Sequence, residues 1–277
     1  MNNSLFTIEL PFVSTNEELE KVQAMYSEYD PYFIASGCIK ERREKIDKLW
    51  QKFKPYTDKH FLEEIKKNFH QRSWEMYIGN VLLSKGLSIK YKNEGPDFIV
   101  NDDIYIECVA STRGDPNKPD SVPEMYVART LEEIQVRDVP VDKMILRITQ
   151  AIKDKELQYE KWKEKTWFNQ KVSFVIAINT GDLMYPQDRS IIRQALFGLK
   201  TVKKQKSEVP VDYFRSEKYN FVSGVLFSYE LVINHPDNLG DDCIFVNNPF
   251  AKNPVNQDFI KKFRNFNNWY SRQQQRY

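Results

Sequence analysis

The sequence has little of what marks secreted, zinc-binding or membrane proteins. Its three cysteines, Cys38, Cys108 and Cys243, lie far apart without a C-x-x-C pair, so neither a disulfide framework nor a zinc site is indicated. No stretch reaches the ~18 consecutive apolar residues of a membrane-spanning helix. The N-terminus lacks the basic start and cleavage pattern of a signal peptide. We therefore expect an intracellular, cytoplasmic protein without a membrane partner.

Several enzyme motifs are also missing. The nine glycines form no phosphate-cradling loop, and there is no G-x-S-x-G elbow, no supported Cys-His pair and no internal repeat. The net charge of +2 does not by itself indicate nucleic-acid binding, because such domains usually carry a strongly basic face. The length of 277 residues, with 41% hydrophobic and 29% charged residues, suits one large globular domain, alone or with an appendage.

The most informative stretch is 74–110. Apolar residues recur at helical spacing from Trp74 and stop at Gly86. We expect the helix to end there, because a glycine suits the left-handed residue that ends a helix. Short strands are then expected at 87–91, 97–100 and 104–110, with a tight turn at 101–103 between the last two. The pattern predicts a helix followed by an antiparallel meander.

Two acids in this hairpin are hard to explain as surface charge. Asp97 opens one strand and Glu107 closes the other, so antiparallel pairing brings them together at one end of the sheet. Glu107 lies in an apolar run typical of a buried strand and would need a compensating cation. Carboxylate oxygens and a main-chain carbonyl, here that of Cys108, are ligands that Mg²⁺ prefers, and Glu75 on the preceding helix is a third acid.

The order of these residues resembles the PD-(D/E)xK, or restriction-endonuclease-like, nucleases. A helix carries Glu75, Pro96-Asp97 opens a strand, and Glu107 follows ten residues on. The resemblance implies an α/β (α+β) fold with a restriction-endonuclease-like core, in which helices flank a central mixed sheet. It also implies that the two strand acids hold one or two Mg²⁺ ions, for which Mn²⁺ is an alternative.

The family pattern has a lysine two residues after the second acid, where this sequence has Val109. A valine can neither orient a water molecule nor neutralise charge on a phosphate, so either the lysine has moved or the activity has been lost. A candidate replacement is Lys155, which falls on the apolar face of a helix expected at 142–164. It is either a peripheral lysine at the edge of that face or one directed at the acidic site, and we favour the second interpretation.

The segment 147–159 also resembles the R-I-x-x-A-I-x-x-K-x-x-x-Y helix of some members of this superfamily. That resemblance implies that Lys155 takes the catalytic role of the missing lysine, while Arg147 or Gln150 steadies the helix or binds backbone phosphate. Arg113 lies in a loop at 111–123 and is a further candidate phosphate contact. On composition alone, an exposed linker without a role fits this loop equally well.

The remaining segments suggest how the chain is divided. Residues 1–70 are expected to form an N-terminal helical region, and 71–277 a nuclease-like core with a C-terminal extension. Further strands are expected at 172–178, 221–229 and 243–246. The tail at 259–277 is read as a helix because its aromatic residues recur at helical spacing.

Two functions of different kinds fit these patterns. The favoured one is a metal-dependent endonuclease, a phosphodiesterase that cleaves nucleic acid, with DNA as the expected substrate. The alternative is a catalytically inactive nuclease-fold protein that binds nucleic acid or a protein partner. A homodimer would suit double-strand cutting, although nothing in the sequence identifies a self-complementary patch.

Overall fold

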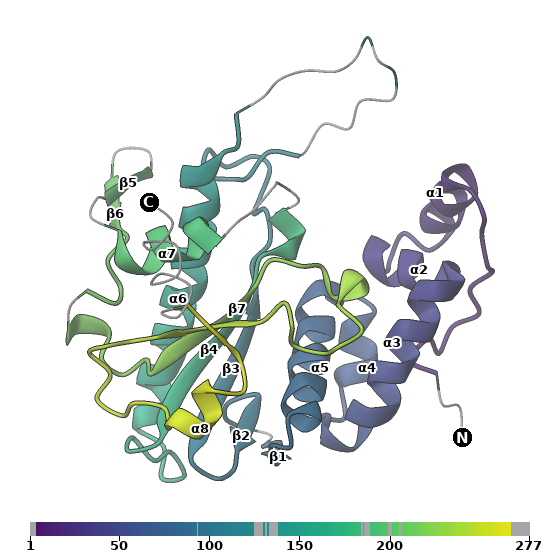
Figure 1. Ribbon diagram of the computed structural model, residues 1–277. Helices are drawn as coiled ribbons and strands as arrows, with labels where there is room; N and C mark the ends of the chain where they lie inside the picture. Colours follow the sequence, from purple (N-terminus) through teal and green to yellow (C-terminus); the bar gives the residue numbers. More distant parts are fainter. Residues whose placement is uncertain are drawn as a thin grey trace. The chain divides into compact units, whose positions relative to one another are not determined.

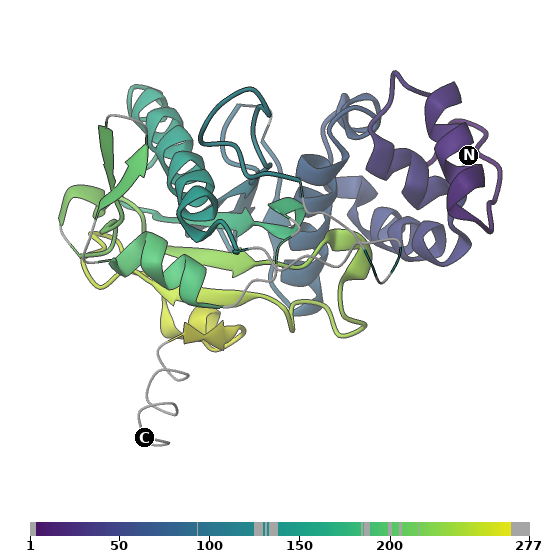
Figure 2. The ribbon, with the colours of Figure 1, turned by 90° about the horizontal axis from the view of Figure 1, so that it is seen from above.

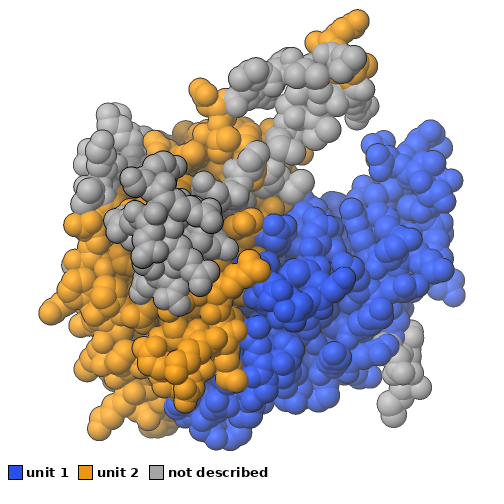
Figure 3. All heavy atoms as spheres, in the orientation of Figure 1, with its two compact units in different colours: residues 1–109, 230–242 blue, residues 110–229, 243–277 orange. Residues whose placement is uncertain are grey.

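The chain forms two compact units, which Figure 3 distinguishes by colour. Unit 1 comprises Met1–Val109 and Glu230–Asp242, and unit 2 comprises Ala110–Tyr229 and Cys243–Tyr277. The expected division at residue 70 stays a prediction. The computed structural model describes residues 4–92, 94–124, 130, 132, 138–183, 185, 189–198, 201–204, 207–215 and 217–266.

Unit 1 begins with helices (Figure 1), and the helix predicted from Trp74 to Gly86 is present as the larger part of α5 (Phe69–Ser84). The first helix starts at a capping box, in which the Thr15 side chain accepts from the Glu18 amide and the Glu18 carboxylate accepts from the Thr15 amide. The helices are α1 (Asn16–Met25), α2 (Pro31–Cys38), α3 (Lys40–Phe53), α4 (Phe61–Ile65) and α5 (Phe69–Ser84), with a 3₁₀ turn at Lys54–Tyr56.

Helix α5 is buried over most of its length. Twelve of its residues are buried, among them Trp74 with no exposed surface. Gly79 lies so close to Phe53 of α3 that a Cβ atom there would stand 2.4 Å from the ring. The Phe53 ring in turn meets Phe98 edge-on, with centroids 5.9 Å apart. These contacts fix α5 against α3 and place it beside the strands that follow.

The three strands of unit 1 form the expected antiparallel meander. They are β1 (Ile89–Lys90), β2 (Phe98–Val100) and β3 (Ile104–Ala110). Each pairs with the next, and Phe98 stands opposite Ile106. The turn between β2 and β3 requires positive φ at Asn101 (50°) and Asp102 (62°). Asn and Asp tolerate this left-handed conformation better than most residues, which explains why an Asn-Asp-Asp sequence makes the turn.

Unit 2 combines parallel and antiparallel pairing. Strand β7 runs parallel to β4 and antiparallel to β8, so that Val225 stands opposite both Ile176 and Val246. Strands β5 and β6 form a separate hairpin. Helix α6 packs against β4 and α7, as Figure 2 shows. The elements are α6 (Val141–Lys163), β4 (Ser173–Asn179), α7 (Arg189–Phe197), β5 (Thr201–Lys204), β6 (Ser207–Pro210), β7 (Gly224–Ser228), β8 (Ile244–Asn247), α8 (Gln257–Ile260) and β9 (Arg264–Asn265).

The α/β fold class is confirmed, with helices and a mixed sheet of seven strands among the described residues. The expected tail helix is wrong where the structure describes it. Helix α8 ends at Ile260, and Arg264–Asn265 then pairs with β8 as a strand; residues 267–277 of that prediction lie outside the described residues. Within the described part of the chain, no helix has the length and apolar character to cross a membrane.

Candidate functional site

The β2–β3 hairpin brings the two predicted strand acids together. The register that pairs Phe98 with Ile106 sets Asp97 opposite Glu107, one step further from the turn. The Asp97 amide donates to Glu107 Oε2 at 3.3 Å, and the Cys108 amide donates to Asp97 Oδ2 at 2.7 Å. One oxygen of each carboxyl group is therefore held by a main-chain N–H of the facing strand.

Burial distinguishes these acids from ordinary surface carboxylates. Glu107 is 3% exposed and Asp97 is half-buried. On α5, Gln71 donates from Nε2 to the Cys108 carbonyl oxygen at 3.2 Å, so the start of this helix reaches the same end of the hairpin. Glu75, one helical turn further on, is 1% exposed. The structure thus gathers Glu75, Asp97, Glu107 and the Cys108 carbonyl within unit 1.

An arginine that the sequence did not suggest joins this group. Arg72 lies on α5 and donates to Glu75 Oε2 at 2.6 Å and to Asp58 Oδ2 at 3.2 Å. Its Nε donates to Glu64 Oε2 at 2.7 Å, and its Nη2 contacts the same oxygen. The guanidinium therefore bridges three carboxylates that come from α4, α5 and the loop before α4. The sequence offered one signal for this, the (i, i+3) spacing of Arg72 and Glu75.

The electrostatics favour a proton on Glu75. Burial, followed by the negative charge of Asp97, raises the pKa of Glu75 to about 8, although the neighbouring Arg72 acts in the opposite direction. Burial also raises the pKa of Tyr91, with Asp58 and Glu75 as the next contributions. The negative charges of Asp58 and Asp97 therefore raise the pKa of both Glu75 and Tyr91. Glu75 is suited to hold or exchange a proton near neutral pH.

The other predicted site residues belong to unit 2. Lys155 is half-buried on α6, and its Nζ donates to Gln158 Oε1 at 3.4 Å. Arg147 and Gln150 line a cavity of about 540 Å³ together with the loop residue Lys118. Arg147 Nε donates to the Thr112 carbonyl at 2.7 Å, which fixes the guanidinium at the cavity wall.

Arg113 is placed differently from the other candidate phosphate contacts. Its Nη1 lies 3.4 Å from Glu124 Oε1, and it is not among the residues that line the Arg147 cavity. Both Arg113 and Glu124 are exposed enough for this ion pair to be weak. A phosphate would therefore compete with the solvated Glu124 carboxylate for the Arg113 guanidinium.

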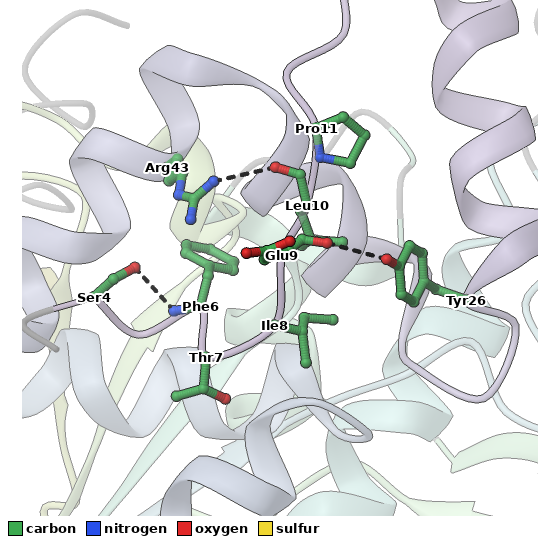
Figure 4. Close-up of a pocket in the computed structure, with 9 residues that line it drawn as sticks. All are labelled: Ser4, Phe6, Thr7, Ile8, Glu9, Leu10, Pro11, Tyr26 and Arg43. Carbon is green, nitrogen blue, oxygen red and sulfur yellow. Dashed lines mark hydrogen bonds between the residues drawn. The ribbon is translucent and has the colours of Figure 1, made fainter.

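Unit 1 also contains a cavity, which the sequence did not suggest. It has a volume of about 600 Å³ and is formed by the segment 4–11 with Tyr26 and Arg43 (Figure 4). The Tyr26 hydroxyl donates to the Glu9 carbonyl at 3.0 Å, and Arg43 Nη1 donates to the Leu10 carbonyl at 3.4 Å. These bonds hold the N-terminal segment in place, and no pattern in the sequence marks them.

The donor set at the hairpin fits a hard divalent cation. It offers two carboxylates and one main-chain carbonyl oxygen, and the main-chain hydrogen bonds already orient both carboxyl groups. Among the described residues, no three side chains of His, Cys, Asp or Glu are arranged to hold a metal ion. An ion at this place would therefore be held by Asp97, Glu107 and the Cys108 carbonyl, with water completing its coordination.

No protein-family model, curated protein or solved structure matches this chain.

Proposed function

We propose that the protein is a Mg²⁺-dependent nuclease that hydrolyses phosphodiester bonds in nucleic acid, with DNA as the expected substrate. One observation carries the proposal. Asp97 and Glu107, ten residues apart, face each other across β2 and β3 and are cross-linked through main-chain amides. Two acids oriented in this way at the end of a hairpin suit the binding of a divalent ion that works on phosphates.

Each residue of this site has a definite task in the proposal. Asp97, Glu107 and the Cys108 carbonyl hold the ion, and Gln71 fixes the carbonyl by its hydrogen bond. When bound, Mg²⁺ would neutralise charge on the phosphate and make water a better nucleophile. Glu75, with its pKa near 8, limits the negative charge beside the ion and is the candidate group to exchange a proton.

The residues of unit 2 have proposed roles in substrate handling. Lys155 takes the place of the lysine missing at Val109 and orients the attacking water, a prediction that rests on the helix pattern. Arg147 and Gln150 bind backbone phosphate in the cavity that they line with Lys118, and Arg113 adds a further phosphate contact. Lys155→Met should lower cleavage while leaving nucleic-acid binding intact.

The decisive experiment uses substitutions that preserve the hydrogen bonds. Asp97→Asn and Glu107→Gln keep an oxygen for the Cys108 and Asp97 amides but remove the charge. Each should reduce Mg²⁺-dependent cleavage of plasmid, single-stranded DNA or RNA by at least ~100-fold while the circular dichroism spectrum is retained. Asp102→Asn is the matched control, because Asp102 lies in the same hairpin and pairs with exposed Lys90 at 2.6 Å. Cleavage that survives either substitution, or that proceeds fully in EDTA, would refute the proposal.

Val109 favours one alternative, a protein of the same design that binds without turnover. Strand β3 has no lysine at the position that the PD-(D/E)xK pattern requires, because Val109 stands there. This alternative predicts that nucleic acid or a protein partner binds without being cut, and that Lys155→Met has no measurable effect. Cleavage assays that include Mn²⁺ as well as Mg²⁺ separate it from the nuclease.

A further inference from the structure

The cavity that the segment 4–11 forms in unit 1 is lined by an arginine with unused donors. Arg43, on α3, borders this space of about 600 Å³ (Figure 4). Its Nη1 donates to the carbonyl oxygens of Leu10 and Gly37, each at 3.4 Å. Within the described part of the chain, Nε and Nη2 form no hydrogen bond, and no carboxylate pairs with the guanidinium. Because adjacent guanidinium nitrogens match two oxygens of a phosphate or carboxylate, this edge of Arg43 suits an anion.

Aromatic rings hold this guanidinium in place. It lies over the rings of Phe6 and Phe12, 5.4 Å from each centroid, at the distance of a cation–π contact. Phe6 is buried, whereas Phe12 is 61% exposed. The amide of the next residue, Val13, donates to the Cys38 carbonyl oxygen at 3.1 Å and so anchors the main chain beside Phe12. An anchored aromatic ring that is open to water is a surface on which a planar ligand can stack.

An acid on the cavity wall narrows the class of ligand. Glu9 is exposed and lines the same space, and among the described residues its carboxylate forms no ion pair with Arg43. It would repel a ligand that is only anionic, but it accepts from a ligand that also carries N–H donors. A nucleotide combines a phosphate, a planar ring and amino donors on the base. The volume of the cavity also falls within the ~300–1,000 Å³ of small-molecule sites.

We propose that this cavity is a nucleotide-binding site, in which Arg43 binds the phosphate, the base stacks on Phe12 and its amino group donates to Glu9. The ligand is either a free nucleotide or the phosphorylated end of a single strand, since both present the same groups. The site shares no residue with the proposed metal pair. The inference therefore stands or falls separately from the proposed nuclease activity.

The test is isothermal titration of the full chain with adenosine 5′-monophosphate in EDTA, so that no metal ion takes part. The variants are Arg43→Met and Phe12→Ala, and each should weaken binding at least ~10-fold. Two controls should bind as wild type does. Arg42→Met changes the neighbouring arginine on α3, which is outside the cavity lining, and Phe250→Ala removes another exposed aromatic ring, 43% exposed. Circular dichroism checks that each variant folds.

Simpler probes separate the two proposed contacts. Adenosine and inorganic phosphate should each bind more weakly than the nucleotide. Adenosine should be insensitive to Arg43→Met, and inorganic phosphate to Phe12→Ala. A short single-stranded DNA with a 5′-phosphate, compared with the same strand without it, then identifies the source of the ligand. Displacement of the nucleotide by the phosphorylated strand alone supports a site for strand ends, and displacement by neither strand supports a site for free nucleotides.

Three results would overturn the inference. The first is a wild-type chain that does not bind adenosine 5′-monophosphate. The second is binding that Arg43→Met and Phe12→Ala weaken no more than their controls do; if Arg43→Met does not fold, Phe12→Ala decides alone. The third is binding that Arg147→Met abolishes, because the nucleotide would then occupy the cavity of unit 2. Asp97→Asn should bind the nucleotide as wild type does, whether or not the metal pair exists.

Discussion

The ionisation of Glu75 gives a prediction that can be measured without knowing the substrate. Burial and the charge of Asp97 raise its pKa from 4.5 to about 8 in the folded chain. The folded state therefore binds a proton that the unfolded state releases between these two values. Stability falls as pH rises wherever the folded state holds more protons. Each pH unit costs at most ~1.4 kcal/mol, so the total loss has an upper bound of about 5 kcal/mol.

The perturbation is Glu75→Gln. The glutamine oxygen can still accept from Arg72 Nη1, which lies 2.6 Å from Glu75 Oε2 in the native protein, but it cannot ionise. The assay is urea unfolding of wild type and variant between pH 5 and pH 9. Within this range, wild type should lose stability relative to Glu75→Gln as pH rises from 5 to 8. The difference between the two proteins cancels the contribution of other titrating groups.

The control is Glu64→Gln, which removes another carboxylate from the same guanidinium but leaves Glu75 in place. The Glu64 side chain is 48% exposed, so this variant should keep the pH dependence of wild type. A stability difference between wild type and Glu75→Gln that stays constant with pH would refute the reasoning. It would mean that the ion pair with Arg72 keeps Glu75 charged throughout, and that burial has the weaker effect.

Two further predictions concern the frame that holds the site. Burial lowers the pKa of His70 from 6.5 to about 4, so its contribution to stability should be lost as pH falls from 6.5 to 4; His70→Gln should flatten that part of the urea-unfolding profile. Gly79→Ala would place a Cβ atom 2.4 Å from the Phe53 ring. The overpacking cost of ~1–3 kcal/mol should outweigh the helix-propensity gain of ~1 kcal/mol, and a net increase in stability in urea would contradict the close contact.

Local signals in the sequence were sufficient to predict the β2–β3 hairpin. An Asn-Asp-Asp turn between two apolar runs sets both strand ends, and because side chains alternate along each strand, the register follows from the turn. The predicted strand at 104–110 agrees with β3, and the juxtaposition of Asp97 and Glu107 follows from the same register. The helix expected at 142–164 agrees with α6 within one residue at each end.

Features that depend on contacts between distant segments could not be predicted. The carboxylates on Arg72 come from Asp58, Glu64 and Glu75, and only the packing of α4 on α5 brings them together. The prediction of a helix in the tail was wrong for a different reason. Phe259, Phe263 and Phe266 have helical spacing, but all three are buried. Burial of a short apolar segment therefore produced the same spacing without a continuous helix.

Arg72 and its three carboxylate partners, Asp58, Glu64 and Glu75, bear on the role of position 109. The PD-(D/E)xK pattern has a lysine there, and this chain has Val109. In the family pattern, a lysine beside the second acid supplies positive charge close to the metal. Here α5 supplies a fixed positive charge among the neighbouring acids, and Glu75 can hold a proton there near neutral pH. The absence of a lysine at position 109 of β3 therefore does not leave the acids of unit 1 without counter-charge. Arg72 is attached to three carboxylates, however, so it balances charge but is not placed to orient a water molecule. Turnover would still require a separate group for that task, and this is the role that the Lys155→Met experiment tests.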